Sequence, residues 1–243
     1  MLSGLHAHIV LFMSMATPGQ TVLLLPVEAG GHVSGRAILE RLGLTVVEMA
    51  VNVTDMSVDI ERTLEISADV RPDYVLVDRS EGLVFEDFSR LGAIPGAVSI
   101  FDASQYLTNI IAGDHPNPLD AGFDLIVASV HKNFPGPQKA ILATRQKDET
   151  WKRILAGVST FVSSMHIAST YAAGLTLART EWLSEYRGRC STSPCYLRSI
   201  SPNLTCRWFR DERTSRRPTT SGFKDRPGRT PSSRMNDLRA PAS

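Results

Sequence analysis

The sequence predicts an α/β fold in which a mainly parallel sheet is sandwiched by helices. Short, continuous apolar runs of strand length recur along most of the chain, and each alternates with a stretch that has helical spacing. Strands that are apolar along their whole length are typical of parallel sheets buried on both faces, because antiparallel sheets more often alternate apolar and polar residues. Such strands, alternating with helices, therefore indicate a sheet covered on both sides.

The same pattern locates the individual elements. Strands are expected at 21–26, 45–51, 74–77, 97–101, 125–129 and 140–144. Helices are expected at 5–16, 33–42, 57–70, 85–91, 104–112, 149–156 and 165–186. The helix at 57–70 opens with Ser57, Asp59 and Glu61, and acidic groups near a helix N-terminus are stabilised by the helix dipole.

The chain divides into two parts of different composition. Residues 188–243 contain eleven Arg, one Lys and four acidic residues, a net charge of +8 (12 − 4). The whole chain carries +1, so the first 187 residues carry −7 (1 − 8). We expect residues 1–186 to form one domain and residues 187–243 to be a disordered basic tail, because the tail has too few aliphatic residues to offset its chain entropy. The abrupt switch suggests that the tail is an out-of-frame translation, which the other two reading frames would test.

The tail also carries the three cysteines, Cys190, Cys195 and Cys206. Their spacing does not offer four ligands and no histidine lies nearby, so no metal site is expected. Positive charge alone could attract nucleic acid or anionic lipid. The aromatic residues Trp208 and Phe209 are not interleaved with the basic ones, which favours a solvated tail with neither nucleic acid nor membrane as a partner. A body without cysteines, a secretory signal or a span of about 20 apolar residues indicates a cytoplasmic protein.

Polar residues gather where the expected strands end. They form four groups, Glu28–His32, Asp78–Glu81, Asp102–Gln105 and Ser129–Lys132. In parallel sheets, ligands bind beyond the carboxyl ends of the strands. We therefore expect the loops that carry these groups to build one site.

Lys132 lies just beyond the strand at 125–129 and before the Pro-Gly-Pro turn at 135–137. Alone, this fits a surface lysine, although desolvation at the edge of a core favours a neutral, nucleophilic amine. Together with Asp102, His32 and a Ser-Gly turn that opens a helix, it favours pyridoxal phosphate. That cofactor needs a lysine for its Schiff base, a carboxylate beside its pyridine nitrogen, a phosphate cradle and a flat group over its ring. Taken singly, Asp102 also fits a helix N-cap, His32 a loop histidine, and Ser3-Gly4 a plain turn.

Several segments resemble, in order and spacing, the serine hydroxymethyltransferase family of fold-type I enzymes. The matching segments are Ser3-Gly4 with the helix after it, Pro18-Gly19, residues 28–32 (EAGGH), 101–104 (FDAS), 111–118 (IAGDHPNP) and 130–137 (VHKNFPGP). They correspond to that family's phosphate-loop helix and following turn, its Gly-Gly-His segment, its aspartate strand with a Pro-Asn-Pro loop, and its Thr-His-Lys motif. The resemblance runs from Ser3 to about Tyr186.

The resemblance implies a role for each matching residue. Lys132 would hold the cofactor through a Schiff base, Asp102 would pair with the ring nitrogen, and His32 would stack on the ring. The other positions that the resemblance places around the cofactor are Ser3 and Gly4 in the phosphate loop, Ser129 and His131 beside the lysine, and Gln105 near the aspartate. His131 joins Lys132 and His32 among the implied catalytic residues.

The implied reaction is reversible cleavage of the Cα–Cβ bond of a β-hydroxy amino acid, with a one-carbon unit passing to tetrahydrofolate. Serine, glycine or threonine would be the substrate, and the complete enzyme would be a homodimer. A threonine aldolase or transaldolase, which runs the same cleavage with an aldehyde acceptor, is the alternative. A catalytically inactive remnant that binds only a cofactor or a partner subunit is a third interpretation.

Several positions depart from the family pattern. Leu5 replaces a hydroxyl residue, Gln105 a histidine and Gln138 an arginine, while Asp78 falls near a family serine. These departures favour the aldolase–transaldolase branch. The family's N-terminal arm and smaller C-terminal domain, which supply acid–base, folate and substrate-carboxylate groups, have no counterpart. The sequence therefore predicts a cofactor site with an incomplete substrate site.

Overall fold

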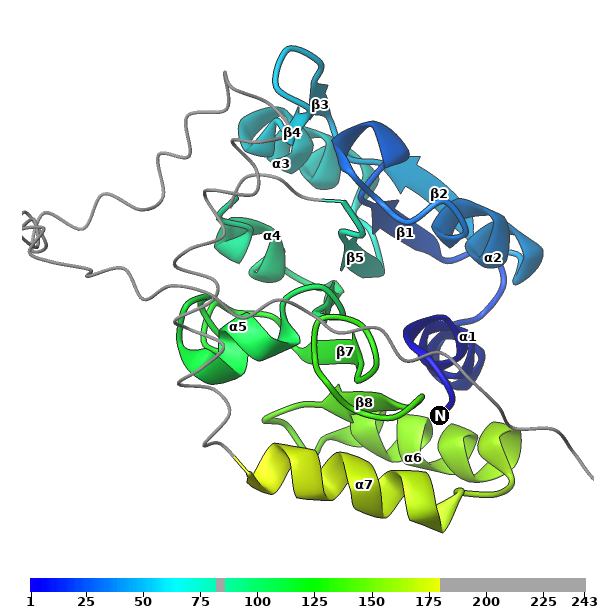
Figure 1. The fold of residues 1–243 in the computed structure, drawn as a ribbon. Coiled ribbons are helices and arrows are strands. Elements are labelled where there is room, and N and C mark those ends of the chain that lie inside the picture. Colours follow the sequence, from blue (N-terminus) through cyan, green and yellow to red (C-terminus); the bar gives the residue numbers. More distant parts are fainter. Residues whose placement is uncertain (82–85, 180–243) are drawn as a thin grey trace, which may run out of the picture. The chain divides into compact units, whose positions relative to one another are not determined.

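The computed structural model describes residues 1–81 and 86–179, which form an α/β fold around a central sheet (Figure 1). The predicted fold class is confirmed. The expected tail at 187–243, its cysteines and the last part of the helix expected at 165–186 lie outside the described residues.

The helices are α1 (Gly4–Met15), η1 (Val27–Ala29), α2 (Gly35–Arg41), α3 (Ile60–Val70), α4 (Ser89–Gly92), α5 (Leu107–Ala112), α6 (Glu149–Val162) and α7 (Ile167–Ala178). The strands are β1 (Thr21–Leu24), β2 (Thr45–Glu48), β3 (Val51–Asn52), β4 (Ser57–Val58), β5 (Tyr74–Asp78), β6 (Val98–Asp102), β7 (Leu125–Ser129) and β8 (Ala140–Ala143).

The central sheet has the strand order β2-β1-β5-β6-β7-β8. Neighbouring strands are parallel from β2 to β7, and β8 pairs with β7 in the antiparallel direction. The carboxyl ends of β5, β6 and β7 therefore meet at one edge of the sheet.

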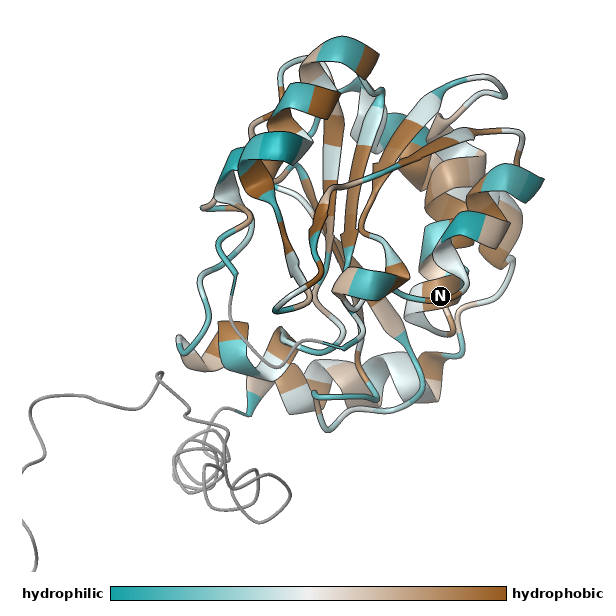
Figure 2. Cartoon of the chain, turned by 90° about the horizontal axis from the view of Figure 1, so that it is seen from above, coloured by the Kyte–Doolittle hydropathy of each residue, from teal (hydrophilic) through white to brown (hydrophobic). Residues whose placement is uncertain are grey.

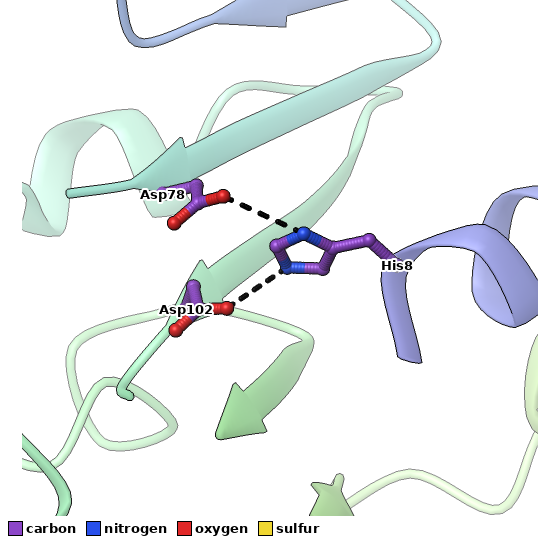
Figure 3. A group of neighbouring side chains, drawn as sticks. All are labelled: His8, Asp78 and Asp102. Carbon is purple, nitrogen blue, oxygen red and sulfur yellow. Dashed lines mark ion pairs between the residues drawn. The ribbon is translucent and has the colours of Figure 1, made fainter. Parts of the chain in front are cut away.

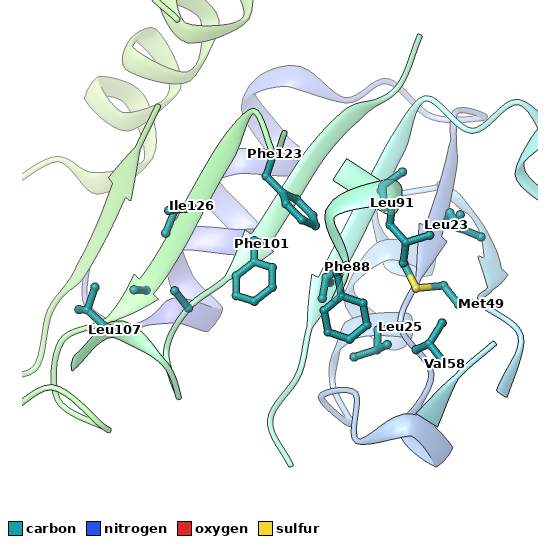
Figure 4. Close-up of a cluster of buried hydrophobic side chains, with 14 of the residues drawn as sticks. Leu23, Leu25, Met49, Val58, Phe88, Leu91, Phe101, Leu107, Phe123 and Ile126 are labelled. Carbon is teal, nitrogen blue, oxygen red and sulfur yellow. The ribbon is translucent and has the colours of Figure 1, made fainter. Parts of the chain in front are cut away.

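Alternate residues of each strand pack on opposite faces of the sheet. In β1, Val22 and Leu24 join the core formed with α1, α2 and α6, whereas Leu23 joins the core formed with α3, α4 and α5. Figure 4 shows the second core, where Leu23 lies among side chains that include Phe88 and Phe101. In Figure 2 the strands are mostly brown, whereas teal segments lie on the helices and loops around them. Each fully buried aliphatic side chain contributes about 1.5–3 kcal/mol to this packing.

The region between β2 and α3 differs from the expectation. The strand expected at 45–51 ends at Glu48, and Val51–Asn52 instead pairs with Ser57–Val58 in a two-stranded antiparallel sheet. The helix expected at 57–70 consequently begins at Ile60, where Asp59 caps it by accepting a hydrogen bond from the Arg62 N–H at 3.0 Å. Ser57 and Val58 therefore pair with β3 in a hairpin and do not form the first turn of the helix, although their spacing is helical.

Within the part of the chain that the structure describes, no helix is long and apolar enough to cross a membrane.

Candidate functional site

The carboxyl edge of the sheet brings together polar groups from β5, β6 and β7. Asp78 and Asp102 are the last residues of β5 and β6 and are register partners, and Ser129 ends β7. All three residues are buried. The prediction that strand ends build a shared site is supported by this arrangement, because parallel strands place their carboxyl ends at the same edge.

Lys132 follows β7 by three residues and is exposed. Its loop is fixed on both sides. The Gly136 N–H donates to the Val130 carbonyl at 2.7 Å, and the side chain of Asn133 accepts the Thr108 N–H at 2.8 Å. A Cβ at Gly136 would lie 2.5 Å from the Val130 oxygen, so glycine is required for this turn. The turn thus holds the lysine at the edge of the sheet.

Asp102 is held by contacts to both of its carboxylate oxygens. Oδ1 accepts the Ser104 N–H at 2.7 Å, and Oδ2 lies 3.0 Å from Nε2 of His8. Burial alone would raise the pKa of Asp102, but the contacts with His8 and Ser104 outweigh it and the pKa is lowered. Asp102 is therefore a carboxylate at neutral pH.

His8, on helix α1, is a site residue that the sequence did not reveal. Its ring lies between the two aspartates, with Nδ1 3.5 Å from Oδ2 of Asp78 and Nε2 3.0 Å from Oδ2 of Asp102 (Figure 3). Burial lowers the pKa of His8, but Asp102 and Asp78 raise it by more, so the net shift is upward. His8 lies two turns of helix from the core residue Met15, but this spacing alone does not show that a histidine is buried there.

Asp78 titrates in the opposite direction to Asp102. Its pKa is raised, first by burial and then by the neighbouring charge of Asp102, while His8, His32 and Lys132 oppose the shift. The charges of Lys132 and His32 thus act on the same buried group. The structure brings both predicted residues into the electrostatic neighbourhood of Asp78.

His8, Asp78 and Asp102 together offer an imidazole and two carboxylates within 4.8 Å of one another. A metal ion would need both carboxylates and one ring nitrogen to converge on a single point. Here each carboxylate faces a different nitrogen, so the ring bridges the two acids (Figure 3). The arrangement is therefore that of a histidine paired with two aspartates, rather than that of a metal centre.

The start of α1 packs against these side chains. Ser3 caps the helix, and its Oγ accepts the His6 N–H at 3.2 Å. The Gly4 N–H donates to Oγ of Ser129 at 2.8 Å. A Cβ at Gly4 would lie 2.8 Å from that oxygen and 3.3 Å from Oδ2 of Asp102, so only glycine lets the helix begin this close to both. Ser3, Gly4 and Ser129 are therefore brought together.

The remaining predicted residues lie around this centre. His32 is half-buried, and its N–H donates to the Asp78 carbonyl at 3.1 Å. His131 is exposed, with Nδ1 3.3 Å from the Lys139 carbonyl oxygen, and Gln105 is half-buried in the turn after Asp102. The roles assigned to these side chains remain predictions.

Known proteins are similar to this chain over about three quarters of its length. No family model matches the chain. It is 31% identical over 195 residues to a serine hydroxymethyltransferase of Pyrobaculum calidifontis, a match that covers 77% of the chain and 45% of the relative. It is 36% identical over 180 residues to a fluorothreonine transaldolase of Streptantibioticus cattleyicolor, covering 72% of the chain and 28% of the relative.

The chain is homologous to serine hydroxymethyltransferases over about three quarters of its length. The resemblance seen in the sequence is confirmed. An L-threonine transaldolase from Pseudomonas fluorescens shares the fold, with a TM-score of 0.67 at 20% identity over 72% of this chain and 41% of that structure. The chain spans less than half the length of these relatives.

Proposed function

We propose that this chain binds pyridoxal phosphate and cleaves the Cα–Cβ bond of a β-hydroxy amino acid. The observation that supports this most strongly is the buried, ionised Asp102 at the same sheet edge as Lys132. Homology to serine hydroxymethyltransferases and threonine transaldolases supports the same chemistry.

The residues of the site fit the cofactor. Lys132 supplies an amine on a fixed loop, and Asp102 supplies a carboxylate for a protonated ring nitrogen. The N-terminus of α1, with Ser3, Gly4 and the adjacent Ser129, offers a place for a phosphate, because helix N-termini attract anions. When bound, the cofactor supplies an electron sink for the carbanion that cleavage leaves behind.

The chain's own groups would do the remaining work. Asp102 would keep the ring nitrogen protonated, and its burial strengthens that charge interaction. His32 would pack on the ring, and His131, next to Lys132, would lie close enough to move protons at the reacting atoms. Gln105 would contact the cofactor from the turn after Asp102. Serine, glycine or threonine is the proposed substrate.

Two acceptors follow from the two kinds of relative. The first candidate is tetrahydrofolate, as in a hydroxymethyltransferase, and it is supported by the match to the Pyrobaculum enzyme. The second is an aldehyde, as in a transaldolase. It is favoured by the 36% identity to the fluorothreonine transaldolase and by Leu5, Gln105 and Gln138, which depart from the hydroxymethyltransferase pattern.

Spectroscopy of the purified protein tests the cofactor. Added pyridoxal phosphate should give the visible absorbance of a protonated Schiff base, and Lys132→Ala should abolish it. The matched control is Lys152→Ala, an exposed lysine that pairs with Glu149 on α6, which should keep the absorbance. A wild-type protein with no such absorbance would contradict the proposal.

Activity assays then separate the chemistries. Serine with tetrahydrofolate reports the first candidate, and threonine with an added aldehyde reports the second. Cofactor binding without turnover in either assay would identify an inactive remnant.

We also propose a homodimer for the complete protein and a cytoplasmic location. Exposed apolar residues of α7, including Ile167 and Tyr171, are consistent with a surface that a second subunit covers.

A further inference from the structure

Helix α1 presents a histidine to two aspartates that the sheet forces together. Asp78 and Asp102 are register partners on neighbouring parallel strands, and both are at least 90% buried. Two carboxylates side by side in a low-dielectric site cannot both ionise without a compensating cation. His8 is 5% exposed and lies between them, so it is the cation in direct contact with both.

The rest of the surroundings add charge at longer range. Lys132, from the loop after β7, acts to lower the pKa of His8 and the pKa of Asp78. His32 also acts to lower the pKa of Asp78. Neither of these residues forms an ion pair with Asp102 within the described chain. The ionisation of Asp102 therefore depends on His8 and on the Ser104 N–H.

The contact between His8 and Asp102 leaves room for a second donor. Nε2 of His8 is buried, and although it lies 3.0 Å from Oδ2, its N–H is not aligned with that oxygen as a hydrogen bond requires. A carboxylate oxygen carries two lone pairs, so an ion pair with His8 does not exhaust Oδ2. Asp102 can thus keep its charge through His8 and still accept a hydrogen bond from a ligand.

We propose that His8 is a positioning residue that keeps Asp102 ionised for the cofactor's ring nitrogen, and that Asp78 influences that nitrogen only through His8. This inference rests on the proposed cofactor. It adds two residues, one on α1 and one on β5, to the machinery around the ring. It also predicts that removing Asp78 restores the cofactor binding lost on removing His8, because without His8 the charge of Asp78 opposes the ionisation of Asp102.

The test compares the wild type with His8→Gln, Asp78→Asn and the double variant. Glutamine places an amide near the position of Nε2 but carries no charge, so Asp78 and Asp102 would repel each other and Asp102 would resist ionisation. The dissociation constant for pyridoxal phosphate is measured from about pH 6 to about pH 9 and expressed as a ratio to the wild type. For His8→Gln this ratio should be largest at acid pH and should fall as the pH rises. Below the pKa that Asp102 has in the variant, the ratio should grow about tenfold for each pH unit.

Adding Asp78→Asn to His8→Gln should bring the ratio back toward one, because the repulsion is gone. His6→Gln, on the same helix with Nδ1 accepting the Leu2 N–H, is the matched control and should stay at one throughout. A ratio for His8→Gln that is constant with pH, or that Asp78→Asn does not reduce, would overturn the proposal, because loss of packing alone gives that result.

Thermal unfolding without cofactor separates this proposal from the proposed function. The pKa of His8 is raised, so its ion pair is present below that pKa and is lost as the pH rises through it. The pKa of Asp102 is lowered, so the pair is also lost as the pH falls through that value. The difference in Tm between wild type and His8→Gln should therefore peak at intermediate pH and shrink at both ends. A constant difference would overturn the role of His8 even in a protein that binds no cofactor, whereas a peaked difference without cofactor binding would sink only the proposed function.

Discussion

Asp78 and Asp102 lie opposite each other at the ends of two neighbouring strands, yet their pKa values move in opposite directions. Burial acts on both in the same sense. The difference arises because Asp102 has the shorter contact with His8, 3.0 Å against 3.5 Å, and also accepts the Ser104 N–H. Two equivalent backbone positions thus have pKa values shifted in opposite directions by their side-chain partners.

The first prediction is that Asp78→Asn stabilises the protein at neutral pH. The pKa of Asp78 is raised, so the folded protein is most stable when Asp78 is protonated. It loses stability as the pH rises through that pKa. An amide avoids this loss while keeping the size of the side chain. Urea unfolding at several pH values should show a gain for the variant at neutral pH that disappears at about pH 3, below the ordinary pKa of an aspartate.

Asp120→Asn is the control for this measurement, because Asp120 is exposed and pairs with Arg145 at the surface. It should change stability little at any pH. A loss of stability in Asp78→Asn at neutral pH would mean that the attraction between Asp78 and His8 outweighs the cost of burying the charge.

Most of the fold could be predicted from the sequence, because its strands are continuous apolar runs separated by helical spacing. The antiparallel direction of β8 was not evident from its own residues. Strand direction depends on the connection, and the ten residues between Ser129 and Ala140 contain no helix in the structure. A parallel strand would need a longer crossover, usually a helix. The length of that loop therefore indicates the antiparallel direction of β8, whereas the apolar residues of β8 do not.

The site was predicted less completely than the fold. Asp102, Ser129 and Lys132 were predicted because they lie at or just beyond the ends of strands, where a change from apolar to polar residues is easy to see. His8 lies inside a helix among apolar neighbours, and spacing alone does not distinguish a buried polar side chain from an exposed one. Its partners come from β5 and β6, more than 65 residues away, so only the folded chain shows why a histidine is buried there.

The second prediction is that Asp102→Asn weakens pyridoxal-phosphate binding at all pH values. An amide cannot hold the charge that keeps a ring nitrogen protonated. Loss of one charge-assisted hydrogen bond costs about 1.5–3 kcal/mol, so the dissociation constant should rise about 10- to 100-fold. Absorbance titration of the cofactor measures it. Asp78→Asn should bind nearly as tightly as the wild type, and equal losses in the two variants would count against the assignment of Asp102.

The third prediction concerns the Gly-Gly-His turn that positions His32. A Cβ at Gly31 would overlap the carbonyl oxygen of Leu25 and lie 2.7 Å from that of Pro26. Gly31→Ala should therefore force the backbone apart and lower the free energy of unfolding by about 1–3 kcal/mol. Thermal or urea unfolding measures the change.

Gly174→Ala is the matched control for Gly31→Ala. Gly174 lies inside α7, and a Cβ there meets nothing within 4 Å. The same substitution should stabilise the helix by about 0.5–1 kcal/mol, because alanine loses less backbone freedom on folding than glycine. Opposite signs for the two variants are expected. A neutral Gly31→Ala would show that the turn can open without cost.

The fourth prediction compares two ion pairs of equal length and different burial. Arg79 and Glu86 are 2.6 Å apart, and their side chains are 5% and 12% exposed. Arg62 and Glu65 are also 2.6 Å apart, but both side chains are 64% exposed. Oε2 of Glu86 also accepts the Val58 N–H at 2.9 Å, which ties the hairpin of β3 and β4 to the loop after β5.

Glu86→Gln should lower the free energy of unfolding by about 3–5 kcal/mol, because it removes the carboxylate that pairs with the buried Arg79 guanidinium. Glu65→Gln should change it by less than about 1 kcal/mol, since water screens an exposed pair. Urea unfolding of both variants, read with the same probe, gives the comparison. The two pairs have the same length, so a larger loss for Glu86→Gln reflects the burial of its pair together with the Val58 contact. Equal effects would instead mean that water reaches Arg79 and that the segment after β5 opens in solution.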